Sequence, residues 1–140
     1  MNKKPAEPHI DDPVNYAREV VGRDPMATHL GIAVEEAREG YARTALTVRP
    51  EHLNAVERAH GATVHAVADQ AFAVACNSLG TLAIAVSMKI TYVSAARDGE
   101  RIVAEATPVN IGRKVSVWRI DVRVAGGALV ASCEGIAYHK

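Results

Sequence analysis

Net charge is the first thing that this sequence lacks. Its 140 residues carry 16 lysines and arginines against 16 aspartates and glutamates. Because nucleic acid is bound by surfaces rich in basic residues, this balance argues against a nucleic-acid partner. No apolar run approaches the roughly 18 residues of a membrane span, and no apolar signal-peptide core follows the N-terminal lysines. We therefore expect a soluble cytoplasmic protein with no membrane partner.

Several reactive motifs are also missing. Cys76 and Cys133 are the only cysteines, and each lies in an apolar segment, as is typical of reduced core residues in an intracellular protein. The six histidines have no zinc-like spacing, so we expect no metal site. No serine lies in a Gly-x-Ser-x-Gly elbow, and no glycine run could cradle phosphate. A serine hydrolase triad and a bound cofactor are therefore not expected.

One stretch that is present dominates the chain, within residues 52–80. Its second half is predicted to be a helix that is apolar almost all the way round, which means that something must surround it. The residues at three- and four-residue spacing are Val64, Val67, Ala68, Ala71, Phe72 and Ala75. Asp69 is the one carboxylate in this run, and an ionised group is costly in a poorly hydrated place unless it is paired or used.

The remaining segments fit one domain over residues 12–140, after a loose tail over residues 1–11. Asp-Pro pairs followed by glycine predict two short helices, over residues 12–22 and 24–31. Alternating apolar residues predict strands over residues 32–36, 41–48, 82–92, 102–109, 118–124 and 129–138. The strand over residues 82–92 alternates bulky apolar residues with small or polar ones.

The predicted order is a hairpin, a long helix and a four-stranded meander. Short turns favour one antiparallel sheet of about six strands wrapped around the helix, an α+β arrangement known as the hotdog fold. A β-sandwich leaves no place for a helix that is apolar all round. A ferredoxin-like fold needs a second long helix, and the sequence contains none.

Three features near the helix have the chemistry of a reactive site. Asp69 lies four residues after His65, on the same helix face, so it is either a base or nucleophile or simply half of a structural pair. His60-Gly61 opens the helix, where backbone N–H groups would stabilise negative charge on a carbonyl oxygen. The alternative is that Gly61 only allows the loop to turn into the helix. Asn54 is a candidate anchor for water or for its loop. Gly112-Arg113-Lys114 is a cationic turn able to attract an anion.

Four short motifs in this region resemble a known family. They are His52-Leu53-Asn54, His60-Gly61-Ala62, Ala68-Asp69-Gln70-Ala71-Phe72-Ala73 and Cys76-Asn77-Ser78. Together they look like the PaaI-type acyl-CoA thioesterases of the hotdog superfamily. The resemblance runs from about residue 24 to residue 138 and includes the strand at residues 90–92 and the cationic turn.

The resemblance implies hydrolysis of a coenzyme A thioester, with coenzyme A as part of the substrate. Asp69 would be the nucleophile or the base that activates water. The N–H of Gly61 would polarise the carbonyl, Asn54 would hold water or the carbonyl, and His60 would position the loop. A homodimer with the site between protomers is implied, often paired into a tetramer.

The resemblance also implies how the substrate is bound. Arg113 and Lys114 would contact the phosphates of coenzyme A, while Phe72 and Ser87 would line the acyl pocket. His65 stands where the family usually has an apolar or small residue, so it would shape that pocket or shift the pKa of Asp69. Ala62 replaces the family's second glycine. The acyl group stays open between phenylacetyl-type and medium-chain groups.

Two other functions fit the same fold. A hotdog hydratase or dehydratase would use a histidine and a carboxylate on one substrate carbon, and His65 with Asp69 are the candidates for this. The sequence lacks, however, the Asp-x4-His loop of such hydratases, because the one pair with this spacing, Asp24 and His29, falls in the short helix predicted over residues 24–31. The second alternative is a protein that binds acyl-CoA without turning it over.

Overall fold

The computed structural model describes residues 10–140, so most of the tail predicted over residues 1–11 lies outside the described residues. The chain begins with α1 (Pro13–Glu19), η1 (Val21–Arg23) and α2 (Pro25–Leu30). Both predicted caps are present: the side chain of Asp12 accepts from the Asn15 N–H at 3.0 Å, and that of Asp24 accepts from the Ala27 N–H at 3.0 Å. The two Asp-Pro pairs therefore start short helices, as predicted.

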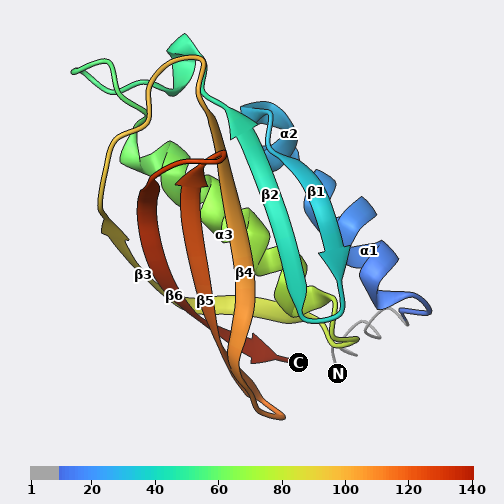
Figure 1. Cartoon of the computed structure of the whole chain (residues 1–140). Helices are drawn as coiled ribbons and strands as arrows, with labels where there is room; N and C mark the ends of the chain where they lie inside the picture. Colours follow the sequence, from blue (N-terminus) through green and yellow to red (C-terminus); the bar gives the residue numbers. More distant parts are fainter. Residues whose placement is uncertain (1–9) are drawn as a thin grey trace, which may run out of the picture.

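Six strands form one antiparallel sheet, in the spatial order β1-β2-β4-β5-β6-β3. Their bounds are β1 (Ala33–Arg38), β2 (Tyr41–Thr47), β3 (Ala83–Tyr92), β4 (Arg101–Ile111), β5 (Val115–Val124) and β6 (Leu129–His139). A short η2 (Pro50–His52) follows β2. Figure 1 shows the sheet curving around one long helix, with α1 and α2 on the β1 side. The predicted hotdog fold is confirmed.

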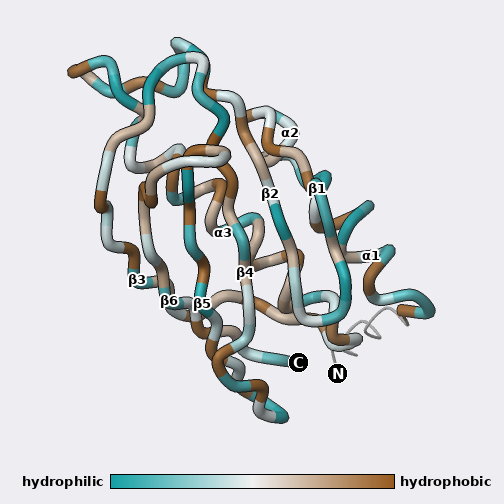
Figure 2. Tube along the Cα trace, in the orientation of Figure 1, coloured by the Kyte–Doolittle hydropathy of each residue, from teal (hydrophilic) through white to brown (hydrophobic). Residues whose placement is uncertain are grey.

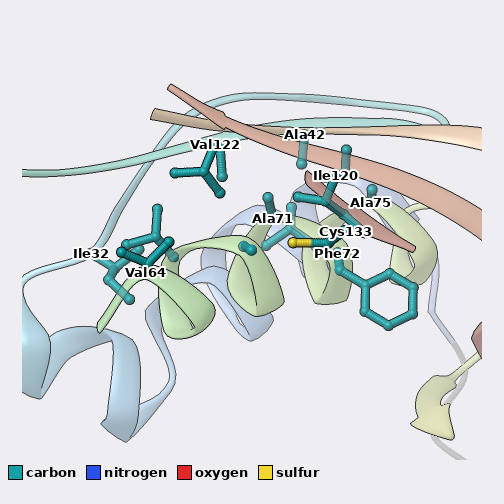
Figure 3. Packing of buried hydrophobic residues seen from close by; sticks show 14 of the residues in the cluster. Ile32, Ala42, Val64, Ala71, Phe72, Ala75, Ile120, Val122 and Cys133 are labelled. Carbon is teal, nitrogen blue, oxygen red and sulfur yellow. The ribbon is translucent and has the colours of Figure 1, made fainter. Parts of the chain in front are cut away.

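The long helix is α3 (Gly61–Asn77), and it forms the centre of the core. Phe72 is fully buried, and its ring lies so close to β6 that a Cβ at Gly135 would come within 2.9 Å of it. Figure 3 shows Ile120 and Val122 reaching from the sheet toward this helix. Figure 2 shows hydropathy changing repeatedly along the strands, as expected for strands with one buried face. No helix within residues 10–140 is long and apolar enough to cross a membrane.

One stripe of α3 is not covered by the sheet. Ala62 is exposed, and His65, Ala66, Asp69 and Ala73 are only partly buried. These positions recur every three or four residues, so they lie along one side of the helix. The prediction that α3 is enclosed all round is therefore wrong for the single chain, because its one sheet covers only part of the helix surface.

The C-terminal end of α3 is tied to β3 by side-chain hydrogen bonds. Asn77 accepts from the N–H of Ala83 at 3.0 Å and donates to its carbonyl oxygen at 3.2 Å. The next residue, Ser78, accepts from the Gly40 N–H at 2.9 Å. The Asn-Ser pair thus fixes the end of the helix against two strand connections.

β3 lies at one edge of the sheet and pairs only with β6. Much of its bulky apolar face is open: Ile84, Val86 and Tyr92 are 46%, 60% and 52% exposed. A bulge interrupts its pairing between Ala85 and Ser87. A ten-residue edge strand with exposed apolar side chains is a surface on which a further strand can pair.

Candidate active site

The first turn of α3 carries one backbone donor that is not used by any group within residues 10–140. His60 caps the helix, because its Nδ1 accepts from the Ala62 N–H at 2.9 Å. Its carbonyl oxygen accepts from Thr63 and Val64 at 2.9 and 3.1 Å. Among the residues described, 10–140, the Gly61 N–H has no partner. This amide is therefore available to an acceptor brought by a ligand, at the positive end of the helix dipole.

A pocket of about 420 Å³ opens at this turn. Its wall combines the 54–59 loop, the start of α3 and the connection after β3. The lining residues are Asn54, Val56, Arg58, Ala59, Gly61, Val64, Tyr92, Val93, Ser94, Ala95 and Ala96. The structure thus brings two predicted site residues, Asn54 and Gly61, into one pocket.

Asn54 organises the loop beside this pocket. Its Oδ1 accepts from the backbone N–H groups of Val56 at 3.0 Å and Arg58 at 3.1 Å. Its own N–H donates to the Arg58 carbonyl oxygen at 2.7 Å. Of the two roles predicted for Asn54, loop anchor is the one that these bonds support. The side-chain amide Nδ2 makes no hydrogen bond within residues 10–140, so it is available to a ligand.

Asp69 lies on the uncovered stripe of α3, and the pocket lining does not include it. Burial raises the pKa of Asp69; the charge of protonated His65 lowers it and the carboxylate of Asp24 raises it. His65 therefore does share a face with Asp69, as predicted. Asp69 lies eight positions after Gly61, which places the two residues about 12 Å apart along the helix axis and about 80° apart around it.

None of the other four predicted substrate-binding residues lines the pocket. Phe72 has no exposed surface, which places it in the core rather than against a ligand. Ser87 is exposed on β3 beside the bulge. Arg113 and Lys114 are exposed in the turn between β4 and β5. That turn and the pocket lie at opposite ends of β4, whose 11 residues span about 35 Å.

Tyr92 and Arg58 are among the pocket residues that were not predicted from the sequence to belong to the site. Tyr92 donates its hydroxyl to the Gly61 carbonyl oxygen at 3.0 Å. Arg58 donates to the backbone oxygens of Val56 and Glu57, at 3.4 and 3.0 Å, and forms no ion pair within the described chain. The sequence signal that could have indicated Arg58 is its position in the loop just before His60-Gly61. Tyr92 lies in the strand at residues 90–92 that the family resemblance includes, but that resemblance gave it no role in the site.

Residues 10–140 contain no cluster of potential metal ligands. No three histidine, cysteine, aspartate or glutamate side chains come together where they could hold an ion. Burial also raises the pKa of the two thiols, to about 12 for Cys76 and about 11 for Cys133, so neither is a thiolate at neutral pH.

A family model described as the thioesterase superfamily matches residues 57–131, which include the His-Gly turn, α3 and most of the meander. The chain belongs to the thioesterase superfamily. It is a thioester hydrolase by this membership and by the named acyl-CoA thioesterases among its relatives.

Relatives within the superfamily agree in sequence and in structure. Acyl-coenzyme A thioesterase PaaI of Escherichia coli is 33% identical over 99 residues, covering 71% of this chain and 71% of that protein. Human acyl-coenzyme A thioesterase 13 is 31% identical over 103 residues, covering 71% of this chain and 74% of that one. The structure of the Escherichia coli PaaI protein superposes with a TM-score of 0.82 at 30% identity, over 84% of this chain and 86% of that chain. The PaaI-type resemblance is therefore confirmed.

Proposed function

We propose that this protein hydrolyses acyl-CoA thioesters to the free acid and coenzyme A, at sites built from two protomers. The observation that carries the proposal is that Gly61 lines a pocket at the N-terminus of α3 and that its N–H has no partner within residues 10–140. A thioester carbonyl oxygen bound there gains negative charge as its carbon is attacked. A fixed backbone donor at that point stabilises the transition state more than the ground state.

Asp69 supplies the second half of the reaction. As a general base, it takes a proton from a water whose oxygen attacks the carbonyl carbon; the carbon–sulfur bond then breaks and the thiolate regains a proton. As a nucleophile, its carboxylate bonds to the carbonyl carbon while the carbon–sulfur bond breaks and the thiolate leaves to be protonated, and water then hydrolyses the resulting mixed anhydride. Both routes need an ionised Asp69, and both leave a carboxylic acid and free coenzyme A.

In this proposal, the Gly61 N–H and the Asp69 carboxylate of one site come from different chains. In one chain, Gly61 and Asp69 are about 12 Å apart along α3, too far to act on the same carbonyl. The uncovered stripe of α3 and the open edge of β3 lie on surfaces that a second copy would cover. Pairing the β3 strands of two copies extends the sheet and sets Asp69 of one chain opposite the pocket of the other. A tetramer would be two such dimers.

Coexpression of two inactive variants should therefore restore part of the activity. We expect that coexpressed Asp69→Asn and Gly61→Ala chains form mixed dimers in which one site carries both changes and the other carries neither. Random pairing then returns about a quarter of the wild-type sites. Thiol release by the mixture, compared with each variant alone, measures this. A mixture no more active than its two parents would place the whole site within one chain.

Arg58 and the Arg113-Lys114 turn are the candidates for the phosphates of coenzyme A. Arg58 lines the pocket of its own chain, whereas the turn would have to come from another. We expect Arg58→Gln to raise KM for an acyl-CoA about three- to tenfold with kcat nearly unchanged, since a charge-assisted contact far from the carbonyl contributes equally to ground and transition states.

A substrate without phosphates provides a control for the proposal that Arg58 binds the phosphates of coenzyme A. An acyl thioester of N-acetylcysteamine lacks the nucleotide, so its KM should not respond to Arg58→Gln. Arg113→Gln and Lys114→Gln, measured in parallel, show whether the turn also contributes. An unchanged acyl-CoA KM in the Arg58 variant would remove this residue from the proposal.

The reaction class is tested by a panel of acyl-CoA thioesters of different chain length and aromaticity. Thiol release supports hydrolysis, and the best substrates decide between phenylacetyl-type and medium-chain groups. Loss of enoyl-CoA ultraviolet absorbance without thiol release would instead indicate a hydratase. Tight binding without turnover would indicate a binding protein. The cytoplasmic location and the absence of a cofactor stay predictions.

A further inference from the structure

We infer that Tyr92 is a positioning residue, which holds Gly61 so that its N–H points at the thioester carbonyl. This inference rests on the proposed function, because it concerns the donor used in that reaction. Tyr92 ends β3, 31 residues beyond Gly61, so the contact joins the edge strand to the first turn of the central helix.

Two contacts connect Tyr92 with Gly61. The hydroxyl donates to the Gly61 carbonyl oxygen at 3.0 Å. The ring lies directly against the glycine, because a Cβ placed there would be 3.1 Å from both the hydroxyl oxygen and the ring carbon that carries it. Tyr92 is still 52% exposed, so water could have satisfied this hydroxyl instead. Its bond to Gly61 is therefore a specific feature of the site.

Gly61 needs such a restraint more than another residue would. Glycine has the greatest backbone freedom of all residues, and Gly61 sits at the first position of α3, where its N–H has no partner in the described chain. Its N–H lies in one planar peptide unit with the His60 carbonyl, which accepts from Thr63 and Val64 at 2.9 and 3.1 Å. The Tyr92 hydrogen bond and ring restrain the following peptide unit, so both units that meet at Gly61 are held.

The surroundings of Tyr92 are themselves fixed. The Val93 N–H donates to the Val130 carbonyl oxygen at 2.8 Å, which holds the residue after Tyr92 against β6. The Ala59 N–H donates to the Ala96 carbonyl oxygen at 2.8 Å, which ties the same connection to the loop before α3. Tyr92 therefore orients Gly61 from a rigid support, as precise placement of an oxyanion donor requires.

Tyr92→Phe tests this inference because it removes the hydroxyl and keeps the ring. We expect kcat for acyl-CoA hydrolysis to fall about five- to tenfold while KM changes less than about twofold, since a misdirected donor weakens the transition state selectively. Tyr138→Phe is the matched control; Tyr138 is also a partly exposed strand tyrosine, and kcat should not change. Melting temperature and gel-filtration volume check that folding and assembly are intact.

A double-mutant cycle shows whether Tyr92 acts through Gly61. In a Gly61→Ala background, Tyr92→Phe should have much less effect than in the wild type, because the donor is already displaced. Additive effects, an unchanged kcat in Tyr92→Phe, or a raised KM at constant kcat would each overturn the inference. A wild-type protein that releases no thiol from any thioester would overturn the proposed function itself, which is a distinguishable result.

Discussion

Replacing Asp69 by asparagine is expected to lower kcat for acyl-CoA hydrolysis by about 10²- to 10⁴-fold, the usual contribution of a general base. Asparagine has nearly the same shape as aspartate but cannot take a proton or act as a nucleophile. Folding should not suffer. Burial raises the pKa of Asp69, so its ionised form is disfavoured in the folded protein, and losing that charge slightly favours folding at neutral pH.

The matched control for this variant is Asp98→Asn, an exposed carboxylate between β3 and β4, for which kcat should stay within about twofold. Thiol release under saturating substrate measures both variants, and thermal unfolding confirms that both are folded. An Asp69→Asn protein with nearly wild-type kcat would rule out a catalytic role for this carboxylate.

The pH profile provides a second test of the same residue. Since Asp69 must be ionised, kcat should fall as pH drops through its raised pKa. Asp24 raises this pKa and protonated His65 lowers it. Asp24→Asn should therefore move the acid limb to lower pH, and His65→Gln should move it to higher pH. Asparagine can still cap α2, so the first change removes a charge without removing a cap.

Gly61→Ala is expected to have the second large effect, a loss of about 10²- to 10³-fold in kcat, as for the removal of an oxyanion donor. The added methyl group would lie 3.1 Å from the Tyr92 ring and hydroxyl, so either the first turn of α3 or the ring must move. A shift of the first turn displaces the N–H from the carbonyl oxygen, and a shift of the ring removes the restraint that we infer for Tyr92. KM should change much less than kcat.

Gly127→Ala is the control for a glycine replacement as such. Its added methyl group would meet only ordinary contacts of 3.5 Å or more, and its backbone does not need positive φ. Kinetics of the two variants on one substrate, together with their melting temperatures, separate a local effect from unfolding. A Gly61→Ala enzyme within about twofold of wild type would show that this N–H is not the donor.

Most of the fold could be predicted because its determinants are local. Both Asp-Pro pairs of this chain start helices, and turn residues separate segments whose apolar residues repeat every two or every three to four positions. The single-chain exposure of Ile84 and Val86 could not be predicted in this way. Alternation shows that a strand has an apolar face but not whether the same chain covers it.

The site was only partly predictable for a related reason. The spacing of Asn54, Gly61 and Asp69 is readable along the chain, but the distance between Gly61 and Asp69 follows from the geometry of the helix between them. The contact between Tyr92 and Gly61 joins positions 31 residues apart that share no repeat. Phe72 shows a different limit of the sequence. Its place in the motif suggested that it lines the acyl pocket, whereas its ring packs in the core against Gly135.

The open edge of β3 has a consequence for how the activity would vary with protein concentration. If each site needs Gly61 from one chain and Asp69 from another, an isolated chain has no complete site at all. Turnover per molecule would then decline on dilution below the dissociation constant of the dimer and recover on concentration. A separated chain would also expose Ile84 and Val86 on an unpaired strand, so the species that has lost activity would also be the one more prone to aggregation.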